Sequence, residues 1–94
     1  MPAIGRRSKM HILFDILAAI EIKGGVAKPT HILYKANLSH PRLKEYLAIL
    51  LERGFIEERD DHGKLRYALT DKGKQFVREF EKIEELSQAF GLEF

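Results

Sequence analysis

A cluster of polar and charged residues near the middle of the chain could contact nucleic acid. Its members are Ser39, His40, Arg42, Lys44 and Glu45. Arginine and lysine pair with guanine edges or with phosphates, and glutamate accepts hydrogen bonds from cytosine. These residues are therefore candidates for contacts in a DNA groove. An ordinary solvated helix surface would carry the same residue types.

Two further groups of basic residues could bind phosphate. Near the N-terminus, Arg6, Arg7 and Lys9 could anchor to the backbone or enter a minor groove, or they could belong to a disordered start. Later in the chain, Lys64 and Arg66 could reach phosphates from a hairpin. The same hairpin carries four acidic residues that oppose such contacts, namely Glu57, Glu58, Asp60 and Asp61.

Positive charge is unevenly distributed along the chain. Residues 1–75 contain 14 Lys and Arg against 9 Asp and Glu, a net charge of +5. Residues 76–94 contain 2 against 5, a net charge of −3. A basic body favours a polyanionic partner through phosphate contacts and counterion release. The acidic C-terminal segment is expected to serve another purpose.

The sequence lacks the residue groups expected of an enzyme, a metalloprotein or a cofactor-binding protein. Cysteine is absent, which removes disulfides, thiolate metal ligands and cysteine nucleophiles. The four histidines are dispersed, and the acidic hairpin lacks the spacing of a calcium loop. The Gly24-Gly25 pair lacks the Lys-Ser/Thr that follows a phosphate-binding loop. We therefore expect no enzymatic activity, no metal and no cofactor.

Length and hydropathy indicate one soluble domain. A chain of 94 residues can bury a single core but not two. No apolar run approaches the roughly 18 residues needed to span a bilayer. The apolar stretch near the N-terminus is interrupted by Asp15 and Glu21, unlike a secretory signal. We expect a cytoplasmic protein with no membrane association and no small-molecule substrate.

The polar cluster must be positioned by the helices around it. Helical periodicity predicts helices over residues 8–23, 29–36 and 40–53. Asn37 readily adopts the left-handed conformation that ends a helix, and Ser39 can cap the next one. The polar cluster should therefore lie at the start of the third helix, on the face opposite its apolar stripe.

A hairpin is predicted after the third helix. Residues 55–59 and 65–69 indicate two strands around a loop over 60–64, and residues 26–28 could add a short strand. In the second strand of the hairpin, alternation predicts Leu65, Tyr67 and Leu69 inward and Arg66 and Ala68 outward. The expected fold class is α+β, mainly α: a winged helix-turn-helix with a two-stranded wing and an extended C-terminal helix.

The last helix, which begins at Asp71 behind Thr70 as its cap, carries one long apolar stripe. The stripe consists of Phe76, Phe80, Ile83, Leu86 and Phe90. Its later turns extend past a body this small, so we expect a two-fold dimer through this helix, as a short antiparallel coiled coil. The alternative is that the helix folds back onto its own domain.

Three sequence motifs resemble those of the archaeal family of small winged-helix DNA-binding proteins and transcription regulators. They are Asn37-Leu38-Ser39, residues 50–56 (LLERGFI) and residues 67–73 (YALTDKG). The likeness covers residues 8–90, and the family includes dimeric members with a C-terminal coiled-coil helix. The resemblance implies that Ser39, His40, Arg42, Lys44 and Glu45 face a major groove, with the wing near the adjacent backbone.

These inferences combine into one functional hypothesis. A basic arm (residues 1–7), a winged-helix DNA-binding domain (8–75) and a dimerisation segment (76–94) would form a homodimer on double-stranded DNA. Such a protein would act as a transcription regulator or compact chromatin. The alternative is a winged-helix module for protein–protein interaction within a larger assembly, which the acidic wing and the apolar tail would suit.

Overall fold

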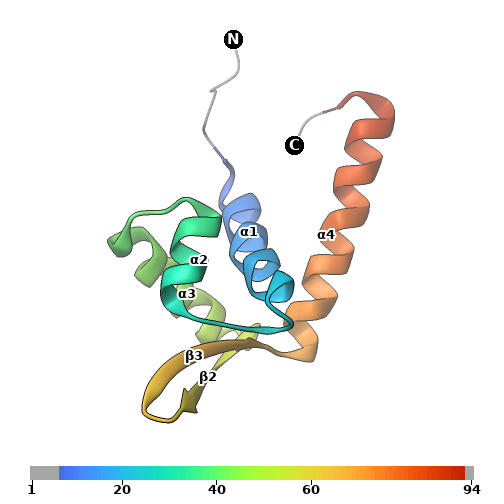
Figure 1. Cartoon of the computed structure of the whole chain (residues 1–94). Coiled ribbons are helices and arrows are strands. Elements are labelled where there is room, and N and C mark those ends of the chain that lie inside the picture. The colour runs from blue at the N-terminus through green and yellow to red at the C-terminus, as the bar shows by residue number, and fades with distance from the viewer. Residues whose placement is uncertain (1–6, 93–94) are drawn as a thin grey trace.

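The computed structural model describes residues 7–92, which form helices around a three-stranded antiparallel sheet (Figure 1). This order of elements confirms the predicted winged helix-turn-helix. In chain order the elements are α1 (Lys9–Ile22), β1 (Val26–Ala27), α2 (Pro29–Ala36), α3 (His40–Glu52), β2 (Ile56–Asp61), β3 (Lys64–Leu69) and α4 (Asp71–Phe90).

Local capping interactions set the helix boundaries. The side chains of Ser8, Ser39 and Thr70 each accept a hydrogen bond from a backbone N–H in the first turn of α1, α3 and α4. Asn37 ends α2 in the left-handed conformation, with φ 55° and ψ 56°. Asn37, Ser39 and Thr70 agree with the sequence predictions, because capping depends on residues only a few positions apart.

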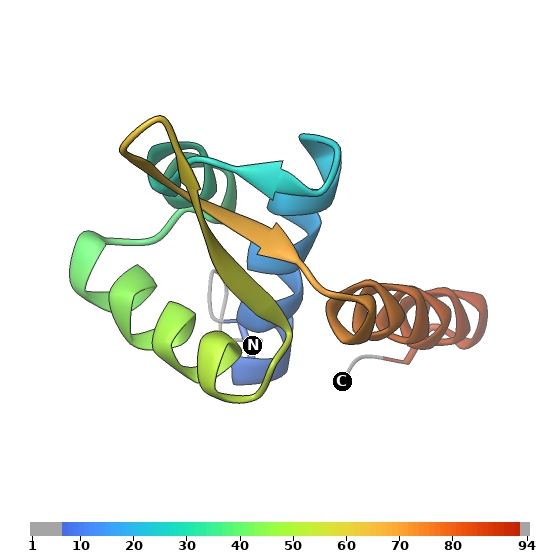
Figure 2. The same cartoon turned by 90° about the horizontal axis from the view of Figure 1, so that it is seen from below.

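Helix α1 forms the centre of the core. Its residues Ile16, Leu17 and Ile20 are fully buried. Seen from below, α1 lies between the α2–α3 pair on one side and α4 on the other (Figure 2). The helix-turn-helix and the C-terminal helix are therefore held together through α1, and α3 is placed at the edge of the molecule with one face free.

The hairpin differs from the prediction at its turn. The strands continue to Asp61 and Lys64, so the connection is the two residues His62 and Gly63 in place of a five-residue loop. Both have positive φ, at 56° and 83°, as in the type I′ turns that match strand twist. Residues 60–64 are all polar or glycine, so the sequence shows no alternation that would mark where the two strands end.

The predicted alternation along β3 holds only in part. Tyr67 and Leu69 are buried as expected, but Ala68 is also buried and Leu65 is 43% exposed. Strand β3 is the middle strand of the sheet, and its successive residues Tyr67 and Ala68 are both buried, so its inner end is covered on both faces. Leu65 lies near the wing tip, beyond the reach of the core.

The start of α4 is tied to the end of α3. Thr70 Oγ1 donates to the carbonyl of Gly54 at 2.6 Å, and Lys72 Nζ donates to the carbonyl of Arg53 at 2.6 Å. A Cβ at Gly73 would collide with the carbonyl oxygen of Phe55, so only glycine allows this close approach. The YALTDKG motif is therefore architectural.

The two halves of α4 have different environments. Phe80 is 3% exposed and stacks on Phe14 of α1, with ring centroids 4.6 Å apart, and Phe76 contacts Phe55 at 5.4 Å. The contact with α1 corrects the prediction that Phe80 belongs to the dimer contact, whereas Phe76 is only partly buried against the α3–β2 connection. The expected dimerisation segment, residues 76–94, continues the same helix as far as Phe90.

The outer half of α4 keeps its apolar stripe exposed. Ile83, Leu86 and Phe90 are 45%, 60% and 69% exposed. A contact of 3.4 Å between His11 Nε2 and a carboxylate oxygen of Glu84 links this half to α1. Within residues 7–92, no helix has the length and apolar character required to cross a membrane.

Candidate nucleic-acid interface

The outer face of α3 presents the polar cluster to solvent. His40, Arg42, Lys44 and Glu45 are exposed, as the sequence predicted. Ser39 is engaged as the N-cap, its Oγ accepting from the Arg42 amide at 3.4 Å. The buried side of the helix is supplied by Leu43, Tyr46, Leu47 and Leu50.

Pro41, Glu45 and Ala48 occupy the centre of this outer face. Pro41 and Ala48 are exposed, and the periodicity of 3.6 residues places them between Lys44 on one flank and Arg42 on the other. Neither Lys44 nor Arg42 forms an ion pair with any other residue in the described part of the chain. A negatively charged molecule could therefore approach this face of α3 closely and contact Lys44 and Arg42. Glu45 reduces the net positive charge of the face.

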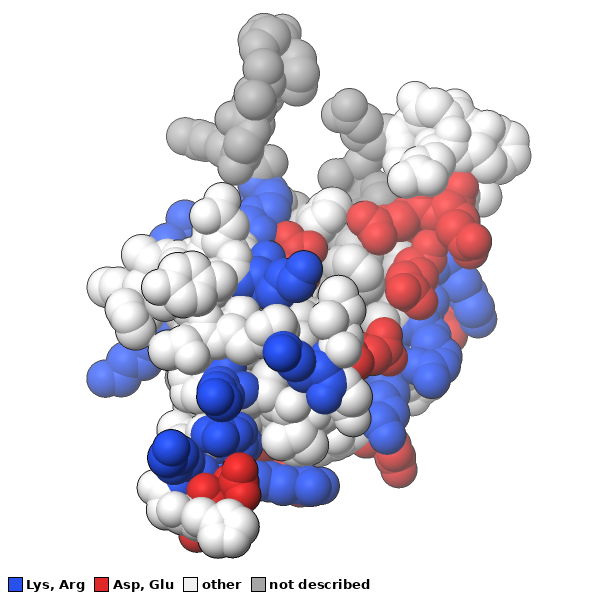
Figure 3. Space-filling model, in the orientation of Figure 1, with Lys and Arg blue, Asp and Glu red and all other residues white. Residues whose placement is uncertain are grey.

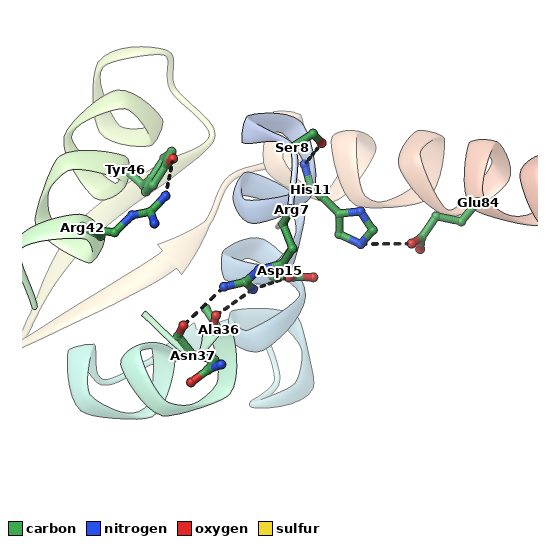
Figure 4. Close-up of polar contacts among 9 residues, drawn as sticks. All are labelled: Arg7, Ser8, His11, Asp15, Ala36, Asn37, Arg42, Tyr46 and Glu84. Carbon is green, nitrogen blue, oxygen red and sulfur yellow. Dashed lines mark hydrogen bonds and ion pairs between the residues drawn. The ribbon is translucent and has the colours of Figure 1, made fainter. Parts of the chain in front are cut away.

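Arg42 is oriented by its neighbour one turn later. Its guanidinium donates to the Tyr46 hydroxyl at 3.3 Å and lies 5.8 Å from the ring centroid (Figure 4). The contact extends the side chain along the helix and leaves other donors of the guanidinium available. A pre-oriented arginine loses less side-chain entropy when it binds a phosphate or a base edge.

A groove of about 700 Å³ separates α3 from the wing. His40 and Lys44 line it on the α3 side, and Glu58 lines it on the wing side. The remaining lining is mainly apolar and includes Leu47, Leu51, Leu65 and Tyr67. Burial, together with the carboxylate of Glu58, raises the pKa of the Tyr67 hydroxyl above its ordinary value. Glu58 makes the wing side of this groove unfavourable for phosphate.

The basic residues of the wing lie on the other face of the hairpin. The strand register pairs Arg59 with Arg66 and Asp61 with Lys64, so these four side chains share one face, and Leu65 and Tyr67 share the opposite face toward α3. Arg66 forms an ion pair with Asp61 at 3.4 Å. The structure therefore separates Lys64 and Arg66 from the α3 cluster.

Arg7 serves the fold and is not part of a free arm. Its guanidinium forms an ion pair with Asp15 at 2.6 Å and donates to the carbonyls of Ala36 and Asn37 at 2.7 and 3.3 Å (Figure 4). The final carbonyls of a helix lack partners within it, and a cation there also suits the helix dipole. This contact corrects the prediction for Arg7. Lys9 is exposed on the first turn of α1, and Arg6 lies outside the described residues.

Sequence reasoning missed two features because each depends on tertiary contacts. The groove forms only when α3 and the wing meet. A second hollow brings together Lys23, Lys28 and Arg66 from three separate elements. The only sequence signal was the pair of lysines that brackets the short segment around β1. No group of three or more His, Cys, Asp or Glu side chains within residues 7–92 is placed to hold a metal.

Comparison with known proteins identifies the family. The family model described as winged helix-turn-helix matches residues 6–88. The chain belongs to the winged helix-turn-helix family. An uncharacterized protein of Methanocaldococcus jannaschii is 37% identical over 86 residues, or 92% of this chain. The match covers 36% of that protein, so the chain spans little more than a third of its relative's length.

Solved structures agree with this assignment. Sso10a-2, a DNA-binding protein from Sulfolobus solfataricus, is similar with a TM-score of 0.78 and 25% identity, covering 89% of this chain and 85% of that chain. SSV1 F-93 has a TM-score of 0.66 and 23% identity over 85% and 88% of the two chains. A MarR family transcriptional regulator from Silicibacter pomeroyi has a TM-score of 0.71 and 16% identity over 80% and 51%. These similarities confirm the expected resemblance to archaeal small winged-helix proteins.

Proposed function

We propose that the protein binds double-stranded DNA as a homodimer and acts as a transcription regulator, with α3 in the major groove. The observation that carries the proposal is the outer face of α3. It is exposed, has the small side chains of Pro41 and Ala48 beside Glu45 at its centre, and has Lys44 and Arg42 at its flanks without ion-pair partners among the described residues. A helix with this surface fits the dimensions of a B-DNA major groove.

The comparisons support this function. Sso10a-2 is described as a DNA-binding protein, and several similar structures are described as transcriptional regulators. The same fold also occurs in proteins with other roles, so the argument for DNA depends on the α3 surface. The net charge of +5 over residues 1–75 is consistent with attraction to a polyanion.

Dimerisation would occur through the outer half of α4. Ile83, Leu86 and Phe90 form an exposed stripe that the rest of the subunit leaves uncovered, and a second copy in antiparallel orientation would bury it. Residues 8–75 and the inner half of α4 would then form the DNA-binding body of each subunit, and the outer half of α4 would form the dimer contact. A two-fold dimer should place its two α3 helices about 34 Å apart, or a multiple of that distance, to reach successive major grooves.

The direct test is a fluorescence-anisotropy titration of duplex DNA at two salt concentrations. The variant Arg42→Ala/Lys44→Ala should bind roughly 10-fold or more weakly, because each good side-chain contact to a base contributes about 1–3 kcal/mol. It should also show a shallower dependence on salt, since fewer counterions are released. Thermal unfolding should be almost unchanged because both side chains are exposed.

A matched control removes the same charge elsewhere. Lys74→Ala/Lys82→Ala deletes two exposed lysines from α4 and should leave DNA affinity within about twofold of the parent, because long-range attraction between exposed charges is screened by salt. Equal losses in both variants would mean that net charge alone drives binding, and α3 would not be the contact helix. A selection of bound duplexes from a random pool then distinguishes a specific regulator, which enriches one motif, from a general compactor.

A protein-interaction module is the second candidate, and the groove between α3 and the wing favours it. The groove is mainly apolar and bears Glu58, so it suits the side chains of a protein partner better than phosphates. Absence of duplex binding at low salt would support this candidate over DNA binding.

A further inference from the structure

A second hollow lies on the opposite side of the hairpin from α3. It has a volume of about 370 Å³ and forms where the end of α1, the segment from β1 to the first turns of α2, and β3 meet. The side chains that matter for its chemistry are Lys23, Lys28, Thr30, His31, Tyr34 and Arg66. None of the residues that line it is acidic.

The charge in this hollow is only partly compensated. Lys23 and Lys28 are exposed and form no ion pair with any residue between 7 and 92. Arg66 is 17% exposed at its side chain, is paired with Asp61 at 3.4 Å, and donates to the Leu65 carbonyl at 3.2 Å. Arg66 is thus held in place with donors left over, because a guanidinium carries five N–H groups.

Neutral polar groups complete the lining. His31 Nε2 lies 3.1 Å from the carbonyl of Ala19, which fixes the ring against α1. Thr30 is exposed, and Tyr34 is 81% exposed. Two hydroxyls beside lysine and arginine donors form the type of surface that binds an anion with several oxygens.

This hollow is separate from the proposed DNA contact of α3. Successive residues of a strand point to opposite faces, so Arg66 faces the hollow, whereas Leu65 and Tyr67 face the groove beside α3. On the face viewed in Figure 3, lysine and arginine side chains gather over the α2 side and the wing, and acidic side chains are found mainly along α4 and at the tip of the wing.

We propose that this hollow binds a phosphate group. Lys23, Lys28 and Arg66 supply the positive charge, and Thr30 and Tyr34 supply hydroxyl donors. The group comes either from a free phosphate-bearing molecule or from the backbone of a nucleic acid that passes this face. Both sources present the same tetrahedral oxyanion, and neither requires α3.

An NMR titration tests the site without DNA. Inorganic phosphate is added to the ¹⁵N-labelled protein at constant ionic strength, with chloride as the balancing anion. The amide signals of Thr30, His31 and Arg66 should move along a saturating curve in the parent protein. In Lys23→Ala/Lys28→Ala the curve should be lost, because two of the three positive charges of the hollow are removed. The fold should be retained, because neither lysine forms an ion pair within residues 7–92. Lys74→Ala/Lys82→Ala should behave like the parent.

A DNA titration distinguishes the two sources. If phosphate saturates the site and the Lys23→Ala/Lys28→Ala variant binds duplex DNA normally, the ligand is a free phosphate. If phosphate does not saturate but the variant lowers the slope of log K against log salt by about 2, the group belongs to a DNA backbone, since each phosphate contact contributes about 0.9. Absence of both effects overturns the proposal. The Arg42→Ala/Lys44→Ala variant tests only the proposed DNA contact of α3, and the Lys23→Ala/Lys28→Ala variant tests only the phosphate site. Failure of one proposal can therefore be told from failure of the other.

Discussion

The outer face of α3 and the outer half of α4 are both helical surfaces that the subunit does not cover, but their chemistry is opposite. The first has Lys44 and Arg42 on either side of Pro41, Glu45 and Ala48, and the second has exposed Leu86 and Phe90 among acidic residues. A cationic face suits a strongly hydrated polyanion, and an apolar stripe suits another apolar stripe. Under the proposed function, one small chain would separate binding of nucleic acid from pairing with a second copy.

The largest expected effect concerns α4. Leu86→Asp/Phe90→Asp should convert the dimer to a monomer, which light scattering coupled to size-exclusion chromatography measures directly. Loss of the second subunit should also weaken duplex binding by roughly 100-fold or more, because paired sites gain about 10²–10⁴ in avidity.

The control for this variant adds the same charge to polar positions of α4. Gln75→Asp/Gln88→Asp changes two exposed residues and should remain dimeric. A parent protein that is already monomeric at micromolar concentration would contradict the role given to the outer half of α4. The outer half of α4 would then differ from the outer face of α3 only in charge and not in having a second copy as its partner.

An intermediate effect is expected at the centre of the α3 face. Ala48→Glu places a second carboxylate, in addition to Glu45, between Lys44 and Arg42 and should lower duplex affinity roughly 10-fold or more, since like charges at an interface cost several kcal/mol. Ala48→Gln adds the same bulk without charge, so the difference between the two variants isolates electrostatics. Glutamate and glutamine are good helix formers, so circular dichroism should show no loss of helix. Equal affinity in the two variants would mean that charge at this face is irrelevant.

The smallest effect is expected at the wing. Lys64→Ala should change duplex affinity by less than about threefold, because Lys64 lies across the hairpin from the α3 groove and opposite Asp61. Anisotropy titrations of this variant and of the α3 variant should be made in the same buffer. A loss at Lys64 as large as that at Arg42 and Lys44 would move the main contact from the helix to the wing.

Features set by neighbours in the chain were predictable from sequence. The caps at Ser8, Ser39 and Thr70 and the left-handed Asn37 depend on a few adjacent residues, so residue type alone indicates them. The exposed position of Lys44 also follows from the apolar stripe on the other side of α3. The order of the elements, and hence the winged helix, was predictable for the same reason.

Features that need a distant partner were not predictable. Phe80 and Ile83 belong to one periodic stripe, yet only contact with α1 decides that Phe80 is buried and Ile83 is not. In the sequence, Arg7 resembled part of a basic arm. In the structure it donates hydrogen bonds to two carbonyls at the end of α2. The cationic hollow depends on the arrangement of β3 beside α2, which brings Arg66 close to lysines about 40 residues away in sequence.

The most direct test of DNA recognition by α3 is to map the bound surface by NMR. A duplex is added stepwise to the ¹⁵N-labelled protein, and shifts or line broadening are followed for each amide. If α3 binds the DNA, the largest changes lie on α3 from His40 to Ala48, with little change in the outer half of α4. Changes absent from α3 and confined to other elements would contradict DNA recognition by α3.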